Sequence, residues 1–298
     1  MFSRISRVYR KTLAIAEKEI KLKLRFPLNF FSEIFIKPFI SLIPYIILYA
    51  GIFTAQSPNN TLITLYLAKD YPDLFNFLLF NFLKDNFSSS FNQTTYLSWL
   101  LVGNIIFIFS RNGFDAFMSR FRTEKYWSTI QGMLLTPINR YLMLLGFVIT
   151  SFIESMIFFV MMIIISFLVY PIAFYQVILI FLIAFLMILA SSGLGLIKGA
   201  VYISTESLLT IFELLQFFIL FISCYSIPIE YFPESLQFLA LINPFYHGVN
   251  SAQNIYFGNY SPDLLFSIGY ITIFAIVTTI LGVYLFNRIW KKFGIHGY

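Results

Sequence analysis

The chain has 298 residues, of which 59% are hydrophobic and 11% are charged, and its mean hydropathy is +0.80. A soluble domain usually carries about 25% charged residues, so this composition excludes the soluble class and indicates a polytopic membrane protein. The net charge of +6 does not indicate a nucleic-acid partner, because the basic residues form no compact basic domain.

Six apolar runs divide the chain, each near the roughly 20 residues that a bilayer-crossing helix needs. They occupy residues 30–53, 96–118, 144–170, 176–197, 207–227 and 264–286. We therefore predict an all-α membrane protein with six transmembrane helices, forming a single transmembrane domain over residues 1–298. Span four ends in small residues, and Gly195 and Gly199 have the spacing for close contact with a neighbouring helix.

The distribution of Lys and Arg predicts the orientation of the spans. Seventeen of the 20 basic residues lie at the termini, at the end of span two and in the connections that follow spans two and four; Lys69 and Lys84 lie on the other side. By the positive-inside rule both termini are cytoplasmic in the cell membrane, and residues 54–95 and 228–263 are external. Four Asn-x-Ser/Thr sequences in these external segments are glycosylation candidates: Asn59, Asn86, Asn92 and Asn259.

The first 26 residues predict an amphipathic helix on the membrane surface. Basic residues such as Arg4, Arg7, Lys11 and Lys18 recur at spacings of three, four and seven, which puts them on one helix face beside apolar residues. Such a helix suits an interface with anionic headgroups. A basic tail that only sets the topology is the alternative.

Catalytic and metal-binding motifs are missing from the sequence. No G-x-x-x-x-G-K-[ST] loop occurs, so the chain does not hydrolyse ATP by that route. His247 and His296 are isolated, which predicts no metal site and no histidine-based catalysis, and Cys224 is the only cysteine. We expect a transport subunit without enzyme activity, catalytic residues or a cofactor of its own.

Ionisable residues within the spans are the remaining polar features. Glu33 with Lys37, and Arg111 with Asp115, are four residues apart and can pair on one helix, which favours a structural role. Three carboxylates lack such a local partner and are functional candidates, unless water reaches them near the inner boundary: Glu154, Glu206 and Glu213.

Residues 227–258 are too apolar for an ordinary external loop and too broken for one straight span. They carry two charges and three prolines, together with a cluster of Asn and Gly. Non-helical backbone at membrane depth survives only where protein or a polar cavity shields it. We therefore predict a re-entrant external helical segment between spans five and six. Its pattern residues are Pro233, Leu236, Asn243 and Pro244.

The second-to-third connection, residues 119–141, begins with charges and continues as an amphipathic run that ends at Thr136-Pro137. A short helix with one apolar face could dock into a groove of a partner protein, or it could merely cap the helical hairpin.

At residues 128–137 and 233–244 the chain resembles the membrane subunits of ABC-2 type exporters, the family of drug, lipid and polysaccharide permeases. The family pattern is roughly E-x-x-G-T-L-E-x-L-L-x-[ST]-P in the first region. Here Ser128 stands where the family often has Gly, and Gln131 where it often has Glu. In the second region, Pro233 to Pro244 match P-x-x-[LF]-x-x-[LI]-x-x-x-N-P. The resemblance covers nearly the whole chain through span number and loop order.

The resemblance implies two facing permease subunits, this chain and a second copy or homologue, each docked on a cytoplasmic ABC ATPase that binds ATP and Mg. The residues it assigns to ATPase coupling are Glu124, Trp127, Ile130, Gln131, Met133, Thr136 and Pro137. In the family, spans two and five commonly line the path. The residues this nominates are Asn104, Phe107, Phe109, Phe212, Glu213, Gln216 and Phe217, although phenylalanines in such a chain can equally be packing residues.

The leading functional hypothesis is a permease subunit of an exporter that moves a lipophilic or amphipathic, drug-like or lipid-like compound outward. An exporter of lipid-linked glycans or polysaccharides is the alternative, because aromatic side chains also stack on sugar rings. A gradient-driven secondary transporter would predict inverted repeats, and none is visible. A membrane enzyme would need a convergent catalytic cluster, which the sequence lacks.

Overall fold

A computed structural model describes residues 2–36, 39–40, 43, 93–128 and 139–294, and this part of the chain is helical without a strand. Two short helices, α2 (Pro27–Phe31) and the π-helix η1 (Ser32–Ile36), follow α1 (Phe2–Leu24). The long helices are α7 (Gln93–Tyr126), α9 (Arg140–Val169), α10 (Phe174–Ser204) and α14 (Pro262–Gly294). Between α10 and α14 lie η3 (Glu206–Leu208), α11 (Leu209–Phe221), η4 (Ile229–Tyr231), α12 (Glu234–Ile242) and α13 (Pro244–Tyr256).

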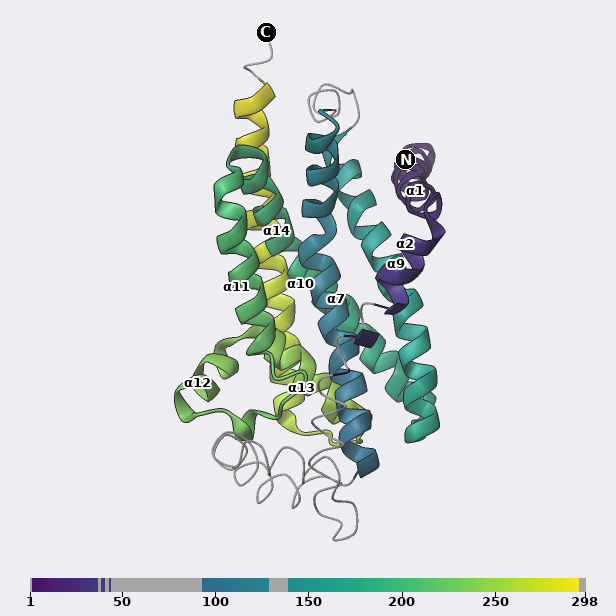
Figure 1. The fold of residues 1–298 in the computed structure, drawn as a ribbon, viewed down its shortest axis with the longest axis vertical. Helices are drawn as coiled ribbons and strands as arrows, with labels where there is room; N and C mark the ends of the chain where they lie inside the picture. Colours follow the sequence, from purple (N-terminus) through teal and green to yellow (C-terminus); the bar gives the residue numbers. More distant parts are fainter. Residues whose placement is uncertain (1, 37–38, 41–42, 44–92, 129–138, 295–298) are drawn as a thin grey trace, which may run out of the picture.

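The four long helices form the bundle. In the described part of the chain, α7, α9, α10 and α14 are the helices long and apolar enough to cross a membrane. They correspond to predicted spans two, three, four and six, while most of predicted span one, 30–53, lies outside the described residues. Figure 1 shows that α1, the end of α7 and the end of α14 lie at one end of the bundle, and α12 and α13 at the other.

Predicted span five, 207–227, differs from the structure. The regular helix α11 covers only Leu209–Phe221, which is shorter than a bilayer crossing needs. The chain then turns through residues 222–228, where Cys224 adopts a left-handed backbone with φ of 58°. The apolar composition of this stretch suggested one span, but the left-handed residue interrupts the helix there.

Two helices extend beyond their predicted ends. Residues 119–126, predicted as part of the cytoplasmic connection, continue α7, and α10 runs to Ser204 instead of 197. Lys198 is therefore inside a helix and buried, not in a cytoplasmic connection. The predicted ends of these two spans lie just before charged residues. Ion pairs between helices compensate these charges, so the helices can continue past them.

Small residues bring α10 against both α7 and α14. A side chain at Gly195 would place its Cβ 2.6 Å from the carbonyl oxygens of Gly113 and Phe114 on α7. On the α14 side, a Cβ at Gly282 would lie 2.6 Å from the Gly193 carbonyl oxygen. Real Cβ atoms do not approach so closely, so these glycines set the spacing of the helices. The predicted close contact at the end of span four is confirmed.

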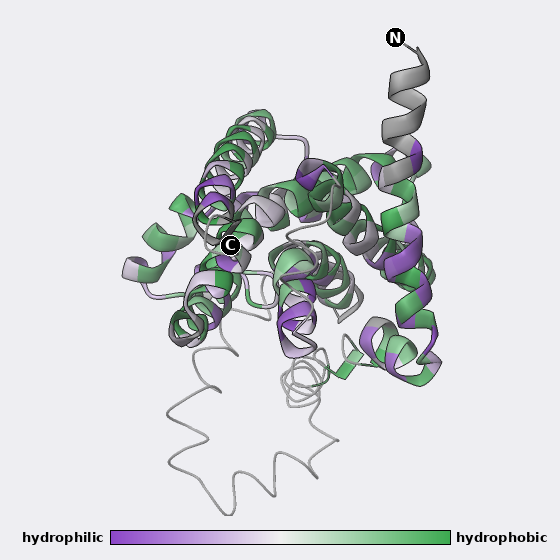
Figure 2. Ribbon diagram, turned by 90° about the horizontal axis from the view of Figure 1, so that it is seen from above, coloured by the Kyte–Doolittle hydropathy of each residue, from purple (hydrophilic) through white to green (hydrophobic). Residues whose placement is uncertain are grey.

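The helix α1 confirms the predicted N-terminal helix and lies across the bundle. It is seen nearly end-on in Figure 1 and lengthwise in Figure 2. Its residues Thr12 and Ala16 are buried, and Ile15 meets Gly146 of α9, while Leu13 and Leu22 are exposed. A helix crossing the bundle end with exposed leucines has the geometry of a surface helix.

The segment predicted as re-entrant is helical and well packed at one end. Nine of the 13 residues of α13 are buried, and the helix lies against α7, α10 and α14. Asn243 caps α13 by accepting a hydrogen bond from the Phe245 N–H at 3.0 Å, and its side chain donates to the Ile219 carbonyl at 2.7 Å. Pro244 occupies the first turn of α13 and Pro233 the N-cap of α12. Leu236 packs against a small cluster that includes Ile222 and Phe232.

Candidate functional site

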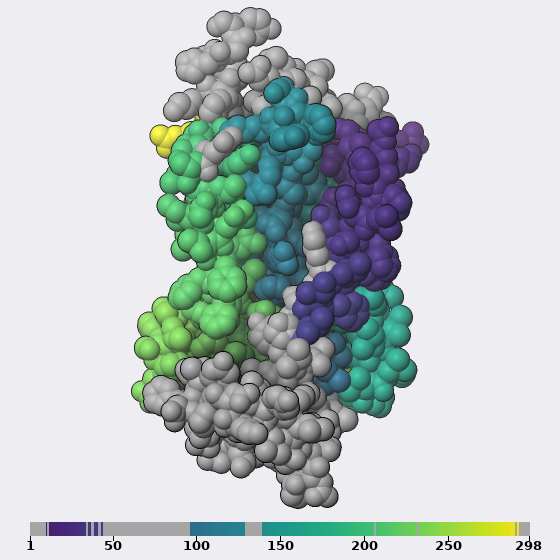
Figure 3. Space-filling view, viewed as in Figure 1, coloured from purple at the N-terminus to yellow at the C-terminus, as the bar shows by residue number. Residues whose placement is uncertain are grey.

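A cavity of about 390 Å³ opens beside α7, near the end of the bundle where α1 lies. Nine of its 16 lining residues are charged, in a chain that is only 11% charged. These nine are Lys23, Glu33, Arg111, Asp115, Arg120, Arg122, Glu154, Lys198 and Glu213. Figure 3 shows the surface of α7 between α11 on one side and α1 and α2 on the other. We call this space the inner cavity.

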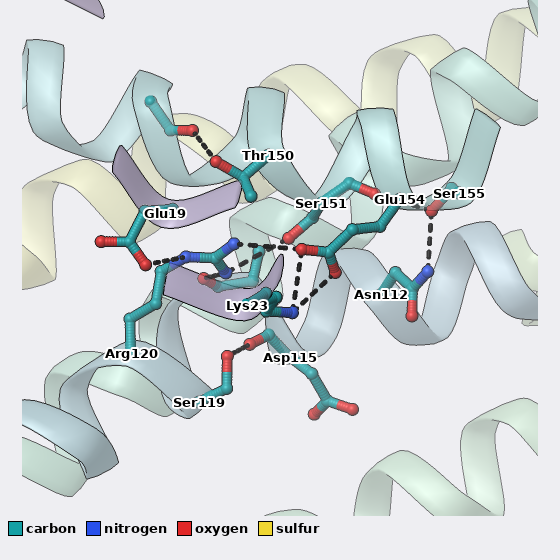
Figure 4. Close-up of polar contacts among 12 residues, drawn as sticks. Glu19, Lys23, Asn112, Asp115, Ser119, Arg120, Thr150, Ser151, Glu154 and Ser155 are labelled. Atoms are coloured by element: carbon teal, nitrogen blue, oxygen red, sulfur yellow. Dashed lines mark hydrogen bonds and ion pairs between the residues drawn. The ribbon is translucent and has the colours of Figure 1, made fainter. Parts of the chain in front are cut away.

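An ion cluster joins three helices at its wall. Glu154 of α9 accepts a hydrogen bond from Lys23 of α1 at 2.9 Å, and its second carboxylate oxygen lies 2.8 Å from the same ammonium. Arg120 of α7 approaches Glu154 at 3.9 Å and Glu19 at 3.6 Å, and it donates to the carbonyl of Ala116 and to Ser151 Oγ. Figure 4 shows these side chains converging between the helices.

The ion pairs of this cluster differ in length. The contact between Lys23 and Glu154 has hydrogen-bonding distance, whereas both carboxylates meet Arg120 at ion-pair distance only. Arg120 also lies over the ring of Phe147, 5.2 Å from its centroid. Because the guanidinium is buried, these partners are needed to offset its desolvation. The cluster therefore holds α1 onto α7 and α9.

A second group of polar side chains joins α7, α10 and α11. Lys198 contacts Asp115 at 3.2 Å and donates a hydrogen bond to Gln216 Oε1 at 2.6 Å. The expected pairing of Asp115 was with Arg111 on the same helix, and the structure gives it a different partner. A buried lysine ammonium needs a counter-charge, and Asp115 supplies it from the neighbouring helix.

The residues nominated for the path fall into two groups. Three of them lie on α11: Glu213 lines the inner cavity and pairs with Arg122 at 3.0 Å, Gln216 accepts a hydrogen bond from Lys198 of that cavity, and Phe217 is exposed. Phe212, also on α11, is half-buried.

The α7 residues of that set lie in or against the protein core. Phe109 is fully buried and packs edge-to-face on Phe152 and Phe159, while Phe107 stacks on Tyr225 with ring centroids 4.2 Å apart. Asn104 is fully buried, and within the described part of the chain neither polar atom of its side chain has a hydrogen-bond partner.

The end of α7 carries the described part of the predicted coupling segment. Tyr126 and Trp127 are 80% and 68% exposed, and their rings meet edge-to-face with centroids 5.4 Å apart. Glu124 is half-buried one turn earlier. Ile130, Gln131, Met133, Thr136 and Pro137 lie outside the described residues. An exposed aromatic pair at a helix end is a typical protein-docking feature.

Ser128 ends α7 with a left-handed backbone, at φ of 55°. Its N–H donates to the Lys125 carbonyl at 3.0 Å, which closes the helix in the manner of a C-cap. Glycine adopts this conformation without the steric cost that a Cβ brings. The structure thus explains why glycine suits this position of the pattern.

We expect Ser128→Gly to stabilise the folded chain by about 0.5–1 kcal/mol, because the left-handed strain of a non-glycine residue exceeds the added flexibility of glycine. The control is Ser119→Gly in the same helix, which should cost about 0.5 kcal/mol because Ser119 has ordinary helical backbone. Unfolding midpoints of the two purified variants test this. A loss of stability in both variants would contradict the role of Ser128.

Several charged residues of the site were not among the predicted site residues. Lys23, Arg120 and Lys198 were counted only as topological charges, although they contact acidic partners on other helices: Lys23 and Arg120 contact Glu154, and Lys198 contacts Asp115. For Lys198 the sequence held a signal, because it shares a helix face with Ser191 and Gly195, the contact face of span four.

Of the sequons, Asn259 is exposed, and Asn59, Asn86 and Asn92 lie outside the described residues. Glu206 lies in η3.

The fold and this site define an all-helical, multi-pass membrane protein with a charged cavity among its helices. A family model described as ABC-2 family transporter protein matches residues 54–284. The chain therefore belongs to the ABC-2 transporter family and is a membrane component of an ABC transporter, which associates with an ABC ATPase. No curated protein matches the chain.

Proposed function

We propose that this chain is the membrane-spanning permease subunit of an ATP-driven exporter that moves an amphipathic compound outward, with ATP and Mg bound by a separate ATPase subunit. The observation that carries the proposal is the inner cavity, where nine charged side chains gather beside α7 within an apolar bundle. An apolar cargo alone would displace water from these charges, including the half-exposed Arg122 and Glu213, and would offer them no hydrogen bond in return. A compound with a polar head and an apolar body would meet both the charges and the apolar helices.

The topology we propose has six passes, with residues 30–53 as the first and the stretch that contains α11 as the fifth. Both termini and residues 119–141 are then cytoplasmic, and α12 and α13 form a re-entrant segment at the external mouth. This is supported by the common end of the bundle at which α1, the α7 C-terminus and the α14 C-terminus lie (Figure 1). Two permease chains and two ATPase subunits make the complete transporter.

The transport proposal is tested with the full chain and its candidate ATPase in inside-out vesicles. We expect ATP-dependent accumulation of a fluorescent amphipathic compound, abolished when the ATPase is inactive. Accumulation driven equally well by a proton or sodium gradient without ATP would contradict the proposal and favour a secondary transporter.

For the coupling end, we expect Trp127→Glu to weaken co-purification of the ATPase at least about thirtyfold, the effect of losing a central interface aromatic of about 2 kcal/mol. The change places a charge on an exposed side chain, so the fold should not suffer. Tyr260→Glu is the control, since Tyr260 is also exposed but lies after α13 at the opposite end. Unchanged association of Trp127→Glu would exclude the docking role.

A further inference from the structure

A second cavity, of about 320 Å³, lies at the other end of the bundle, between α13, the start of α7 and the connection after α11. We call it the outer cavity. Its chemistry differs from that of the inner cavity, because Glu230 is the single charged residue among the 12 that line it. Side-chain amides and aromatic rings make up most of the remainder: Trp99, Tyr246, Asn250, Gln253, Asn254, Phe257 and Asn259.

One face of α13 builds much of this wall. Tyr246, Asn250, Gln253, Asn254 and Phe257 follow one another at spacings of four, three, one and three residues, which places them on the same side of the helix. The face therefore presents an aromatic ring at each end and three amides between them. Trp99 of α7 and Glu230 belong to the other walls.

Hydrogen bonds hold the walls in place. Gln253 donates to the Trp99 carbonyl at 3.2 Å, which fixes α13 to α7. Tyr96 donates to the Ser226 carbonyl at 2.9 Å, which fixes the connection after α11 to the same part of α7. The cavity is thus bounded by packed elements, and its polar groups are already positioned.

The amides retain unused hydrogen-bonding capacity. Asn254 donates to Asn250 Oδ1 at 3.3 Å, and Gln253 uses one N–H on Trp99. A side-chain amide has two donor hydrogens and two acceptor lone pairs, so both donors of Asn250 and the carbonyl oxygens of Gln253 and Asn254 remain open within the described part of the chain. Alternating donors and acceptors are the complement of adjacent hydroxyl groups.

We infer that the outer cavity binds a neutral sugar ring, the polar part of the exported compound. Hydroxyl groups would bond the amides of Asn250, Gln253 and Asn254, and the C–H face of the ring would lie on an aromatic side chain. Glu230 disfavours an anionic group, and the volume is near the lower end of the roughly 300–1,000 Å³ of ligand pockets. It therefore suits one ring. The identification of this sugar as cargo rests on the proposed export function, whereas binding itself does not.

The test measures binding without ATP, using the full chain in lipid nanodiscs. Trp127→Phe and Trp290→Phe leave Trp99 as the sole tryptophan, so its fluorescence reports on the cavity. The probes are methyl α-glucopyranoside, ethanolamine and inorganic phosphate. We expect a saturable response to the glucopyranoside alone, retained in Glu230→Gln and weakened at least about fivefold in Asn250→Leu, which removes the amide.

Asn287→Leu is the matched control, because Asn287 lies on α14 and donates to Tyr141 at 3.1 Å, away from the cavity. If Asn250→Leu does not fold, Asn254→Ala serves instead. A folded protein without a saturable response to the glucopyranoside would overturn the inference. So would a response to ethanolamine that Glu230→Gln abolishes, which would mark a site for a cationic headgroup. Either result leaves ATP-dependent export untouched, and failed export leaves sugar binding untouched.

Discussion

Glu154→Gln is expected to destabilise the folded chain by about 3–5 kcal/mol, the usual cost of breaking a buried ion pair by removing one partner. The carboxylate lies at 2.8 Å from the Lys23 ammonium and 3.9 Å from the Arg120 guanidinium. Its side chain is 14% exposed and that of Arg120 is 7% exposed, so water does not replace the lost charge, and Glu19 at 3.6 Å is left to pair with the guanidinium. Chemical unfolding in micelles, followed by circular dichroism, measures the loss.

The control for this prediction is Glu213→Gln. Glu213 pairs with Arg122 at 3.0 Å, but both side chains are about half exposed, at 50% and 53%. Exposed pairs contribute about 0–1 kcal/mol, so this variant should unfold almost like the wild type. Equal losses in the two variants would show that burial does not govern these ion pairs.

A second substitution tests why Glu154→Gln loses stability: because an attraction is lost, or because a buried cation is left without its partner. Adding Lys23→Met to Glu154→Gln removes the ammonium that loses its carboxylate partner in the first change, whereas Arg120 keeps Glu19 at 3.6 Å. We expect the double variant to recover part of the stability, because replacing both members of a buried pair is often nearly neutral. A double variant less stable than Glu154→Gln alone would contradict this explanation.

The helical class and four of the spans could be predicted because each depends on residues close together in the sequence. Length and apolar composition suffice for α7, α9, α10 and α14. The break before α13 was equally local, since Pro244 and the capping Asn243 act on adjacent backbone. Span five was less predictable, because an apolar stretch does not reveal the left-handed residue at Cys224.

The inner cavity could not be predicted, because its charges meet only through the packing of α1, α7, α9 and α10. Arg120 and Glu154 are on different helices, as are Asp115 and Lys198. A sequence pattern detects partners three or four residues apart, and this led to the pairing of Arg111 with Asp115. The outer cavity could not be predicted for the same reason. The sequence shows the amide face of α13, but it does not show that this face lies beside Trp99.

The close backbone contact between α7 and α10 at Gly195 gives the second large effect. We expect Gly195→Ala to destabilise the chain by about 3 kcal/mol, the upper end of measured overpacking. The added Cβ would lie 2.6 Å from two backbone carbonyl oxygens of α7, those of Gly113 and Phe114. A side chain could rotate away, but a helix backbone cannot, so α7 and α10 would have to separate.

The same substitution at Gly269 supplies the control. Gly269 lies within α14, and an added Cβ there meets no atom within 4 Å. Alanine is a better helix former than glycine by about 1 kcal/mol, so Gly269→Ala should raise the unfolding midpoint while Gly195→Ala lowers it. Equal shifts would mean that helix propensity, and not the close approach, explains both. Because Lys198 and Asp115 face each other across the same two helices, Gly195→Ala should also impair transport more than Gly269→Ala does.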